Sequence, residues 1–357
     1  AATTGALNVA VGSNALLTNI TGTRNSALGV GALQLNTASD NVAIGYHALD
    51  TCAGGSNNTA VGTEAMDANT SGSANVAVGY RALDANTTAD NNVAIGQSAL
   101  TASTTAANNV AIGYNAGLSV TTGASNTFVG GLAGDATDDG HSNVAVGYQA
   151  LTTNCGNYNT AVGHIALYSC NTGGNNNTGV GIGAGFDITH GDNNTCLGQG
   201  AGNTGNPGGA ITTASNRIAL GDDAVTHIYA QVSSITGASD ARDKTDFTPL
   251  DLGLDFVKAL APVTYKWDKR SKYGDKTAEG YDLTAQTPDG THKEDWLDVG
   301  FTAQAVEALE NAAGYSTDTN TNLIYDINPD GKSMGLQYTK FIPILVKAIQ
   351  EQNALIE

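Results

Sequence analysis

One short segment carries side chains that could perform nucleophilic and acid–base chemistry. Ser239-Asp240-Ala-Arg242-Asp-Lys244 places a hydroxyl, a carboxylate, a guanidinium and an amine close together in the chain. A serine hydroxyl becomes a nucleophile only when a base removes its proton, and a lysine made neutral by burial can be that base. Serine and aspartate also favour helix N-caps and turns, so the same residues are compatible with an ordinary structural turn.

Two acidic clusters could bind a cation. Residues 326–331, Asp-Ile-Asn-Pro-Asp-Gly, match the first half of a calcium-binding loop. The twelfth position of that loop is Gln337, where a bidentate glutamate is expected, and Asn-Pro-Asp-Gly is also typical of a hairpin turn. The second cluster, which we interpret as a solvated loop, consists of Asp135, Asp138 and Asp139. We expect no metal and no cofactor.

The charge distribution divides the chain and excludes two classes of partner. The net charge is −18, and because phosphate binding needs clustered Lys and Arg, we expect no nucleic-acid partner. Residues 1–237 contain 3 basic and 13 acidic residues, whereas residues 238–357 contain 12 and 20, so a domain boundary is expected near residue 235.

No apolar run reaches the length of a membrane span, so no membrane insertion is expected. The chain begins with alanine and shows no signal peptide, which is compatible with a fragment that lacks its N-terminal attachment region.

A repeat of about 17 residues fills residues 1–221. The pattern is Asn-Val/Thr-Ala-Val/Ile-Gly, with glycines at 12, 29, 45, 62, 79, 96, 113, 130, 147, 163, 181, 198 and 221. Successive glycines are 16 to 18 residues apart except for the last pair, which are 23 apart. Regular copies of this kind indicate a repeat architecture.

Each position of the repeat has a physical interpretation. Val, Ile or Leu precedes every glycine, and the residue two places before it is small in every copy except that of Phe128. This alternation predicts a short strand with β-branched residues on one face and alanine on the other. The asparagine four places before the glycine predicts a ladder of side-chain hydrogen bonds, and the glycine permits a positive φ at a corner. Alanine also follows every glycine by three places.

These features predict a mainly β fold whose shaft is a parallel β-solenoid with one 17-residue coil per repeat. Coils about 4.8 Å apart would give a rod of roughly 60 Å. Because alanine lets a second chain approach closely, we expect a parallel homotrimer in which the alanine face of each chain meets its neighbours. The pattern over residues 1–221 resembles the left-handed β-roll heads of trimeric autotransporter adhesins and similar collar segments of phage fibres, although those heads have a somewhat shorter repeat.

The cysteines do not have the spacing of a zinc site. None of the four belongs to a Cys-x-x-Cys pair. Cys155 and Cys170 are separated by about one repeat, so they would lie on neighbouring coils, and a disulfide between them is one alternative.

Four further motifs follow the repeats, at 239–244, 260–267 (LAPVTYKW), 299–307 (VGFTAQAVE) and 338–352 (YTKFIPILVKAIQEQ). In this order and spacing they resemble the endosialidase-type intramolecular chaperone of phage tail fibres and tailspikes. The resemblance spans 236–357 and implies an α+β chaperone domain at 238–357. We expect connecting strands at 223–237 between this domain and the shaft at 1–222.

The resemblance implies a serine–lysine autopeptidase. Ser239 would be the nucleophile, Lys244 the base and Ala238–Ser239 the scissile bond. Family members assemble this site in the trimer, so that cleavage follows correct folding. Supporting polar residues would be Asp240, Arg242 and Gln304. The family often has glutamate after this glutamine, whereas this chain has Ala305, so no role carries over to that position.

Two helices are expected in this domain. Phe301–Asn311 has an apolar face, and Thr339–Glu357 carries a heptad-like stripe of Leu345, Ile349 and Ile356. The second helix would either form a three-chain coiled coil or pack on its own domain. Residues 268–296 indicate an exposed loop or an extra hairpin.

The leading hypothesis is a phage tail-fibre segment in the virion that attaches to the host. Its partners would be two copies of itself, other phage tail proteins and a host-surface receptor, either a glycan or a protein. The only reaction would be a single self-cleavage.

Alternatives are a bacterial trimeric surface adhesin, which would need a C-terminal membrane anchor, and a glycan-degrading tailspike, for which the repeats lack a loop to hold paired carboxylates. An ice-binding solenoid would need regular threonine arrays. Candidate receptor contacts, or simply an exposed edge, are His47, Tyr80, Tyr114, Tyr148 and His164.

Overall fold

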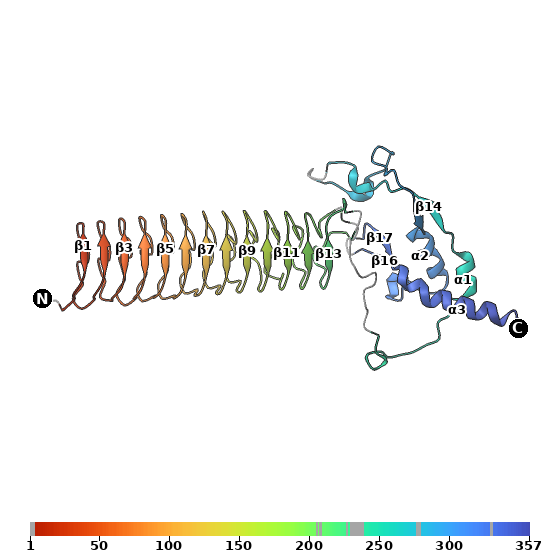
Figure 1. The fold of residues 1–357 in the computed structure, drawn as a ribbon, viewed down its shortest axis with the longest axis horizontal. Helices are drawn as coiled ribbons and strands as arrows, with labels where there is room; N and C mark the ends of the chain where they lie inside the picture. The colour runs from red at the N-terminus through yellow and green to blue at the C-terminus, as the bar shows by residue number, and fades with distance from the viewer. Residues whose placement is uncertain are drawn as a thin grey trace. The chain divides into compact units, whose positions relative to one another are not determined.

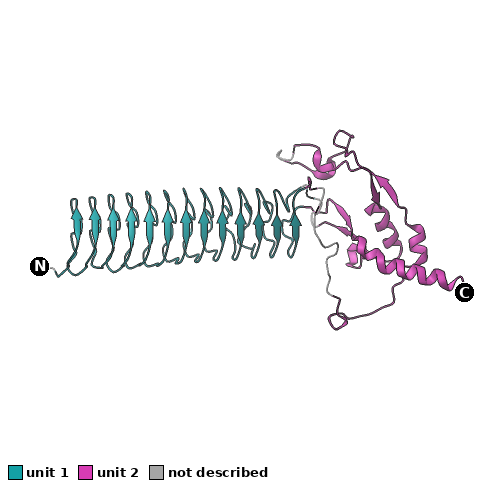
Figure 2. Ribbon diagram, viewed as in Figure 1, with its two compact units in different colours: residues 1–206, 210–222 teal, residues 207–209, 223–357 magenta. Residues whose placement is uncertain are grey.

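The computed structural model describes residues 4–204, 206, 209–225, 228, 239–275, 280–328 and 331–357. The chain divides into two units, residues 1–206 with 210–222 and residues 207–209 with 223–357 (Figure 2). Most of the predicted connecting strands at 223–237 lie outside the described residues, and the described positions 223–225 and 228 are not in a strand. Of the helices that the structure describes, none is both long and apolar enough to cross a membrane.

The first unit is a stack of coils joined by one parallel sheet. Each repeat contributes one three-residue strand, and each strand pairs in register with the strand of the next repeat (Figure 1). The predicted parallel β-solenoid is therefore confirmed. The thirteen strands are β1 (Val9–Val11), β2 (Ser26–Leu28), β3 (Val42–Ile44), β4 (Thr59–Val61), β5 (Val76–Val78), β6 (Val93–Ile95), β7 (Val110–Ile112), β8 (Thr127–Val129), β9 (Val144–Val146), β10 (Thr160–Val162), β11 (Thr178–Val180), β12 (Thr195–Leu197) and β13 (Ile218–Leu220).

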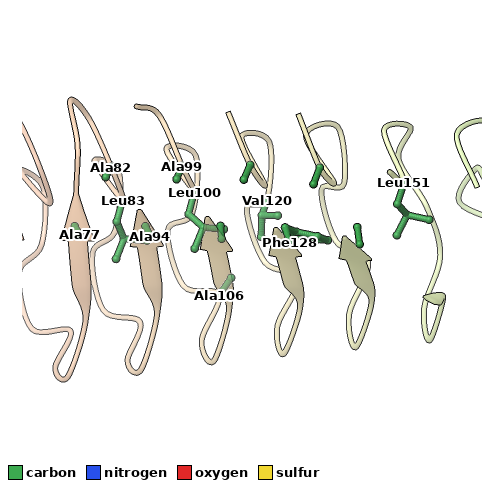
Figure 3. Packing of buried hydrophobic residues seen from close by; sticks show 14 of the residues in the cluster. Ala77, Ala82, Leu83, Ala94, Ala99, Leu100, Ala106, Val120, Phe128 and Leu151 are labelled. Carbon is green, nitrogen blue, oxygen red and sulfur yellow. The ribbon is translucent and has the colours of Figure 1, made fainter. Parts of the chain in front are cut away.

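The repeated alanines lie inside the coil rather than on a face that meets another chain. Ala94, Ala99 and Leu100 of one coil are completely buried, and the same positions of successive coils form a continuous interior column (Figure 3). In the same strand Ile95 points outward and is 37% exposed. The prediction that the alanines contact neighbouring chains was therefore wrong. A 17-residue coil encloses so little space that small side chains and about one leucine per coil fill it.

Glycine and left-handed residues turn each coil. Gly96 has φ +133°, and a Cβ there would overlap the carbonyl group of Gly113 on the next coil, so glycine is required. In the same coil Asn91, Ser98 and Leu100 have φ of 60°, 57° and 51°. Because a left-handed residue other than glycine costs roughly 1–2 kcal/mol, burial of the leucine side chain must offset the strain of its own backbone.

Phe128 is accommodated by a glycine on its own coil and another on the preceding coil. Its ring is completely buried at a position where most coils have alanine. Most coils have a buried leucine or methionine at the repeat position that Gly117 occupies on the preceding coil and Gly134 occupies on the coil of Phe128 itself. A Cβ at either glycine would meet the Phe128 ring at less than contact distance. The large side chain therefore fills the volume that the two missing side chains leave.

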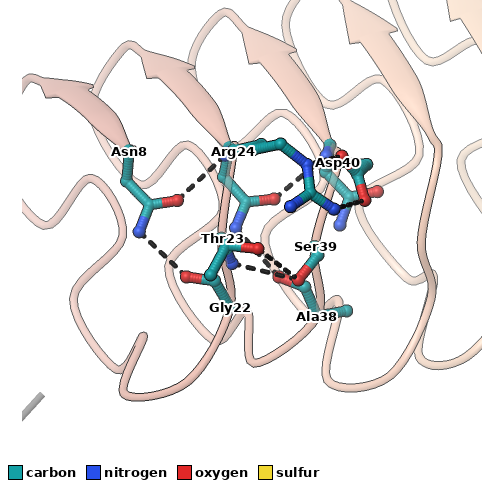
Figure 4. Close-up of polar contacts among 9 residues, drawn as sticks. Asn8, Gly22, Thr23, Arg24, Ala38, Ser39 and Asp40 are labelled. Atoms are coloured by element: carbon teal, nitrogen blue, oxygen red, sulfur yellow. Dashed lines mark hydrogen bonds and ion pairs between the residues drawn. The ribbon is translucent and has the colours of Figure 1, made fainter. Parts of the chain in front are cut away.

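The predicted asparagine ladder connects every coil to the next. In the first coils the Oδ1 of Asn8 accepts from the backbone N–H of Asn25 at 2.9 Å, while its Nδ2 donates to the carbonyl of Gly22 at 2.9 Å (Figure 4). Farther along, the completely buried Asn92 accepts from Asn109 N at 2.9 Å and donates to the carbonyl of Ala106 at 2.9 Å. Each buried amide thus satisfies two backbone groups that water cannot reach.

The second unit combines helices with two antiparallel strand pairs. Its helices are α1 (Leu254–Ala259), α2 (Ala303–Ala312) and α3 (Phe341–Ala354). Its strands are β14 (Val263–Tyr265) with β15 (Asp298–Gly300), and β16 (Tyr325–Ile327) with β17 (Met334–Leu336). Short 3-10 turns are η1 (Ala241–Asp243), η2 (Arg270–Lys272), η3 (Leu283–Ala285), η4 (Thr317–Thr319) and η5 (Tyr338–Lys340). The core consists of Leu252, Phe256, Val306, Ile324, Phe341 and Ile344.

Both predicted helices are present, and α3 has two apolar faces. Phe341, Ile344 and Ala348 are buried in the domain, whereas the predicted heptad-like stripe, represented by Leu345 and Ile349, is exposed. The two alternatives proposed for this helix are therefore compatible, since one face packs on the domain and the other stays open. Within 268–275 and 280–296, the described parts of the predicted loop, there are two 3-10 turns and no strand.

A double-mutant cycle tests the packing around Phe128. Phe128→Ala should lower the free energy of unfolding by about 3–5 kcal/mol, because it leaves a cavity that the surrounding coils cannot close. Gly134→Leu alone should also destabilise the shaft, since its side chain would overlap the ring. The double variant Phe128→Ala/Gly134→Leu restores the side chains found in most coils and should recover most of the loss in chemical unfolding. Additive losses would contradict this account.

The asparagine ladder can be tested at one rung. Asn92→Ala leaves the buried N–H of Asn109 and the carbonyl of Ala106 without partners, which should cost about 2–4 kcal/mol. Gln97→Ala, an exposed position in the same coil, should stay within about 0.5 kcal/mol of the parent. Equal stability of the two variants in chemical unfolding would show that the ladder is unimportant.

Candidate active site

A short 3-10 turn brings the two ends of the Ser239–Lys244 segment together. Asp240 is the N-cap of η1, and its Oδ1 accepts a hydrogen bond from the backbone N–H of Arg242 at 2.9 Å. The N–H of Asp243 then donates to the carbonyl of Asp240 at 3.2 Å, and that of Lys244 to the carbonyl of Ala241 at 3.3 Å. The turn that serine and aspartate typically initiate is therefore present, and it also positions the side chains on either side of it.

Ser239 and Lys244 are hydrogen-bonded to each other. The Nζ of Lys244 donates to the Oγ of Ser239 at 2.7 Å, a distance suited to proton transfer between the two groups. Both side chains are exposed in the single chain. A charged ammonium can only donate in this contact, whereas a neutral amine could accept the serine proton.

Asp240 and Arg242 form a separate ion pair. The Nη2 of Arg242 lies 2.5 Å from the Oδ2 of Asp240, and the Arg242 side chain is largely exposed. Hydrogen bonds from the Arg242 side chain and backbone hold the pKa of Asp240 below its usual value, and the same contact raises the pKa of Arg242. Since the two charges satisfy each other, neither side chain competes for the contact between Ser239 and Lys244.

The remaining predicted site residues are not brought to this pair. Gln304 is exposed on α2, and the interactions of the described residues do not connect it with Ser239 or Lys244. Ala238, the residue before the predicted cut, lies outside the described residues.

The second, third and fourth motifs meet in the second unit. The indole N–H of Trp267, at the end of the second motif, donates to Asp298 at 3.2 Å, and β14 pairs with β15 beside it. The Tyr338 hydroxyl accepts from the N–H of Phe301 at 3.2 Å, and a Cβ at Gly300 would overlap that hydroxyl. The glycine of the third motif therefore makes room for the tyrosine that begins the fourth.

One structural residue escaped the sequence analysis. Glu310 is completely buried in α2, and its carboxylate accepts hydrogen bonds from the N–H groups of Leu323 at 2.8 Å and Ile324 at 2.6 Å. It thereby joins the end of α2 to the segment before β16. An acidic residue in line with the apolar face of the helix was the only sequence signal for this role.

The calcium-like segment and the cysteines are structural elements of a hairpin and of the shaft interior. Residues 326–328 and 331 belong to the β16–β17 hairpin, in which the N–H of Asn328 donates to the carbonyl of Ser333 at 2.8 Å. Residues 329 and 330 lie outside the described residues. The four cysteines are buried free thiols, so the alternative of a disulfide between Cys155 and Cys170 is not realised. Burial raises the pKa of Cys155 to about 11 and that of Cys170 to about 12, which disfavours the reactive thiolate.

The segment that contains the Ser239–Lys244 pair is similar to a known protein family. Residues 239–315 match the family model described as chaperone of endosialidase, and the match begins at Ser239 and ends before the 338–352 motif. This family is found in phage tail proteins and is associated with trimerisation. No curated protein and no solved structure matches the chain significantly. The chain thus combines a β-solenoid with a segment, residues 239–315, that is similar to the chaperone of endosialidase, and this similarity starts at the serine of the candidate site.

Proposed function

We propose that this chain is a segment of a trimeric phage tail fibre whose C-terminal domain directs folding of the shaft and is then released by cleavage at Ala238–Ser239. The observation that carries the cleavage proposal is the 2.7 Å contact between Ser239 Oγ and Lys244 Nζ. The family match beginning at Ser239 supports the same position.

The proposed cleavage is an acyl shift followed by hydrolysis. Neutral Lys244 removes the proton of the Ser239 hydroxyl, and the oxygen attacks the carbonyl carbon of Ala238. The amide nitrogen of Ser239 takes up the proton and leaves, so the peptide bond becomes an ester between Ala238 and the serine oxygen. Water then hydrolyses the ester, which yields a carboxylate on Ala238 and a free amino group on Ser239.

Assembly would switch on this reaction. An exposed ammonium keeps its proton, and lysine becomes an effective base when it is desolvated or placed near another cation. Ser239 and Lys244 are exposed in the single chain, so covering them by other chains of the trimer would supply the desolvation. Asp240 and Arg242 hold the turn, and Gln304 would approach the site only in the assembled form. Cleavage would then follow trimer formation.

The outer face of the solenoid is a suitable trimer interface. The residue before each corner glycine points outward and is apolar in every coil, as in Leu28, Ile95 and Ile112. These side chains form a stripe along the whole first unit, and soluble monomers rarely expose a continuous apolar surface of that length. The proposed interface is therefore this stripe of Val, Ile and Leu, in place of the alanines.

The second unit offers another surface for the same assembly. On α3 the apolar residues Ile342, Leu345, Val346 and Ile349 are all exposed. Three such faces brought together around an axis would bury them, as in a coiled coil.

A folding domain at the end of such a shaft has a physical justification. Because the repeats are nearly identical, a neighbouring chain displaced by one whole coil would meet almost the same outer surface. Such a slip costs little locally, so register must be specified elsewhere. A C-terminal trimer that forms first would align the chains before the shafts associate.

The remaining elements of the proposed function follow from the family's occurrence. The fibre would lie in the virion, contact other phage tail proteins and bind a host-surface glycan or protein. Its receptor contacts would come from the edge just after the corner glycines, where Tyr46, Tyr80, Tyr114 and Tyr148 are exposed. The tailspike alternative would differ by an added glycan-degrading site.

Cleavage is tested by comparing the wild-type chain with Ser239→Ala and Lys244→Gln on denaturing gels and by intact mass. The wild type should yield the fragments 1–238 and 239–357, and both variants should stay whole, because one lacks the nucleophile and the other the base. Lys258→Gln, which changes an exposed lysine on α1, should cleave normally. A folded, trimeric wild type that stays intact would refute self-cleavage, and cleavage of Ser239→Ala would identify another nucleophile.

The interface is tested by the double variant Ile95→Asp/Ile112→Asp. Six buried carboxylates in the trimer should prevent shaft association, so light scattering after size exclusion should give a lower mass than for the parent. Thr105→Asp, an exposed loop position between the same strands, should remain trimeric. If both variants form trimers of equal stability, the stripe is not the interface.

A further inference from the structure

Neighbouring coils bring a histidine next to a column of acidic side chains. Asp50, Asp67 and Asp84 each lie five places after a corner glycine, so they stack on three successive coils. His47 is on the first of these coils, and its Nδ1 lies 2.7 Å from the Oδ2 of Asp50. This mixture of imidazole and carboxylates is a set of metal-ligating groups.

The cluster has too little positive charge for its carboxylates. Arg81 pairs with Glu64 at 2.7 Å and lies 3.5 Å from Asp84, so the one guanidinium is already shared between two acids. Among the described residues no salt bridge connects Asp67, the middle acid of the column, to a cation.

Two carboxylate oxygens in this cluster are buried without a partner. The Oδ1 atoms of Asp50 and Asp67 are shielded from solvent, and no hydrogen-bond donor reaches either of them. Burying an unpaired carboxylate oxygen is costly, and a bound cation would remove that cost. This observation is independent of the presence of acidic residues, since most exposed carboxylates on a protein are simply hydrated.

The three side chains converge closely enough to share one ion. One ligand atom from each of His47, Asp50 and Asp67 lies within 4.8 Å of the others. Tetrahedral ligands about 2.0–2.2 Å from zinc are roughly 3.3–3.6 Å apart, so modest side-chain rotations would complete the geometry. The preceding coil leaves room for the imidazole, because a Cβ at Gly31 would lie only 3.2 Å from the His47 ring.

We propose that His47, Asp50 and Asp67 bind one divalent transition-metal ion of the zinc class and thereby clamp two adjacent coils of the shaft. Imidazole favours zinc and its transition-metal neighbours, whereas calcium and magnesium prefer ligand sets made of oxygen alone. The ion would replace the hydrogen bond between His47 and Asp50. It would also bind the Oδ1 atoms of Asp50 and Asp67, which have no hydrogen-bond partner. Water would supply the fourth ligand.

The test uses the untagged full chain after treatment with a chelator, titrated with zinc chloride in a calorimeter. His47→Ala and Asp67→Asn should each bind one zinc ion fewer than wild type, or bind it at least about tenfold more weakly. Zinc should raise the thermal unfolding temperature of the wild type and have a smaller effect on both variants. Asp67→Asn is nearly isosteric and carries the test if His47→Ala does not fold, as judged by circular dichroism.

His164→Ala is the matched control, because His164 is exposed on another coil and has no part in the cluster. Its zinc binding should equal that of the wild type. Wild-type protein that binds no zinc, or binding that is unchanged in both ligand variants, would overturn the proposal. Calcium or magnesium binding in preference to zinc at these residues would overturn the assigned class of ion.

Discussion

Backbone hydrogen bonds in the shaft run between coils, so each coil must match the backbone path of its predecessor at the points where they meet. The strands keep strict register from β1 to β13, and the buried asparagines connect the backbone just before each strand to the next coil. Variation in length is confined to the turns between these points, including the longest spacing, between β12 and β13. The corner glycine, the left-handed residues and the small interior side chains are all consequences of this match, because each keeps the backbones of successive coils within hydrogen-bonding distance.

The same constraint separates the inside of the shaft from its outside. A coil of this length encloses mainly small side chains, a buried asparagine and about one larger apolar side chain. Phe128 fits only because its own coil and the preceding one have glycine where most coils have leucine or methionine. The β-branched residues of the strands are therefore left on the surface, where they form a long apolar stripe. In the proposed trimer this stripe would meet the other chains, and the nearly identical coils would allow those chains many similar registers. A dedicated folding domain at one end is a physically reasonable solution to this problem.

The contact between Ser239 and Lys244 is built in a different way from the shaft. A 3-10 turn capped by Asp240 places Ser239 and Lys244 in contact without any long-range packing, so the geometry of the pair is local. Its environment is not local, because both side chains face solvent in one chain. Under the proposed function, the local turn would bring the two side chains together and contacts with other chains would desolvate them, so cleavage would begin only after assembly.

The sequence by itself determined the period, the parallel solenoid and the asparagine ladder, because each depends on residues at fixed short spacings. The sequence indicated Ser239 and Lys244 as a pair through its resemblance to the endosialidase-type chaperone. It also indicated the helix at the C-terminal end. It could not decide which face of the strand was internal, since alternation distinguishes two faces without saying which one the coil encloses. Only the tertiary structure placed the alanines inside, matched Phe128 to Gly117 and Gly134, and assigned Glu310 to a buried structural role. It also brought His47 and Asp50 beside Asp67, a residue of the next coil. Contacts of this kind depend on how coils and segments stack, and the spacing of residues along the chain does not encode them directly.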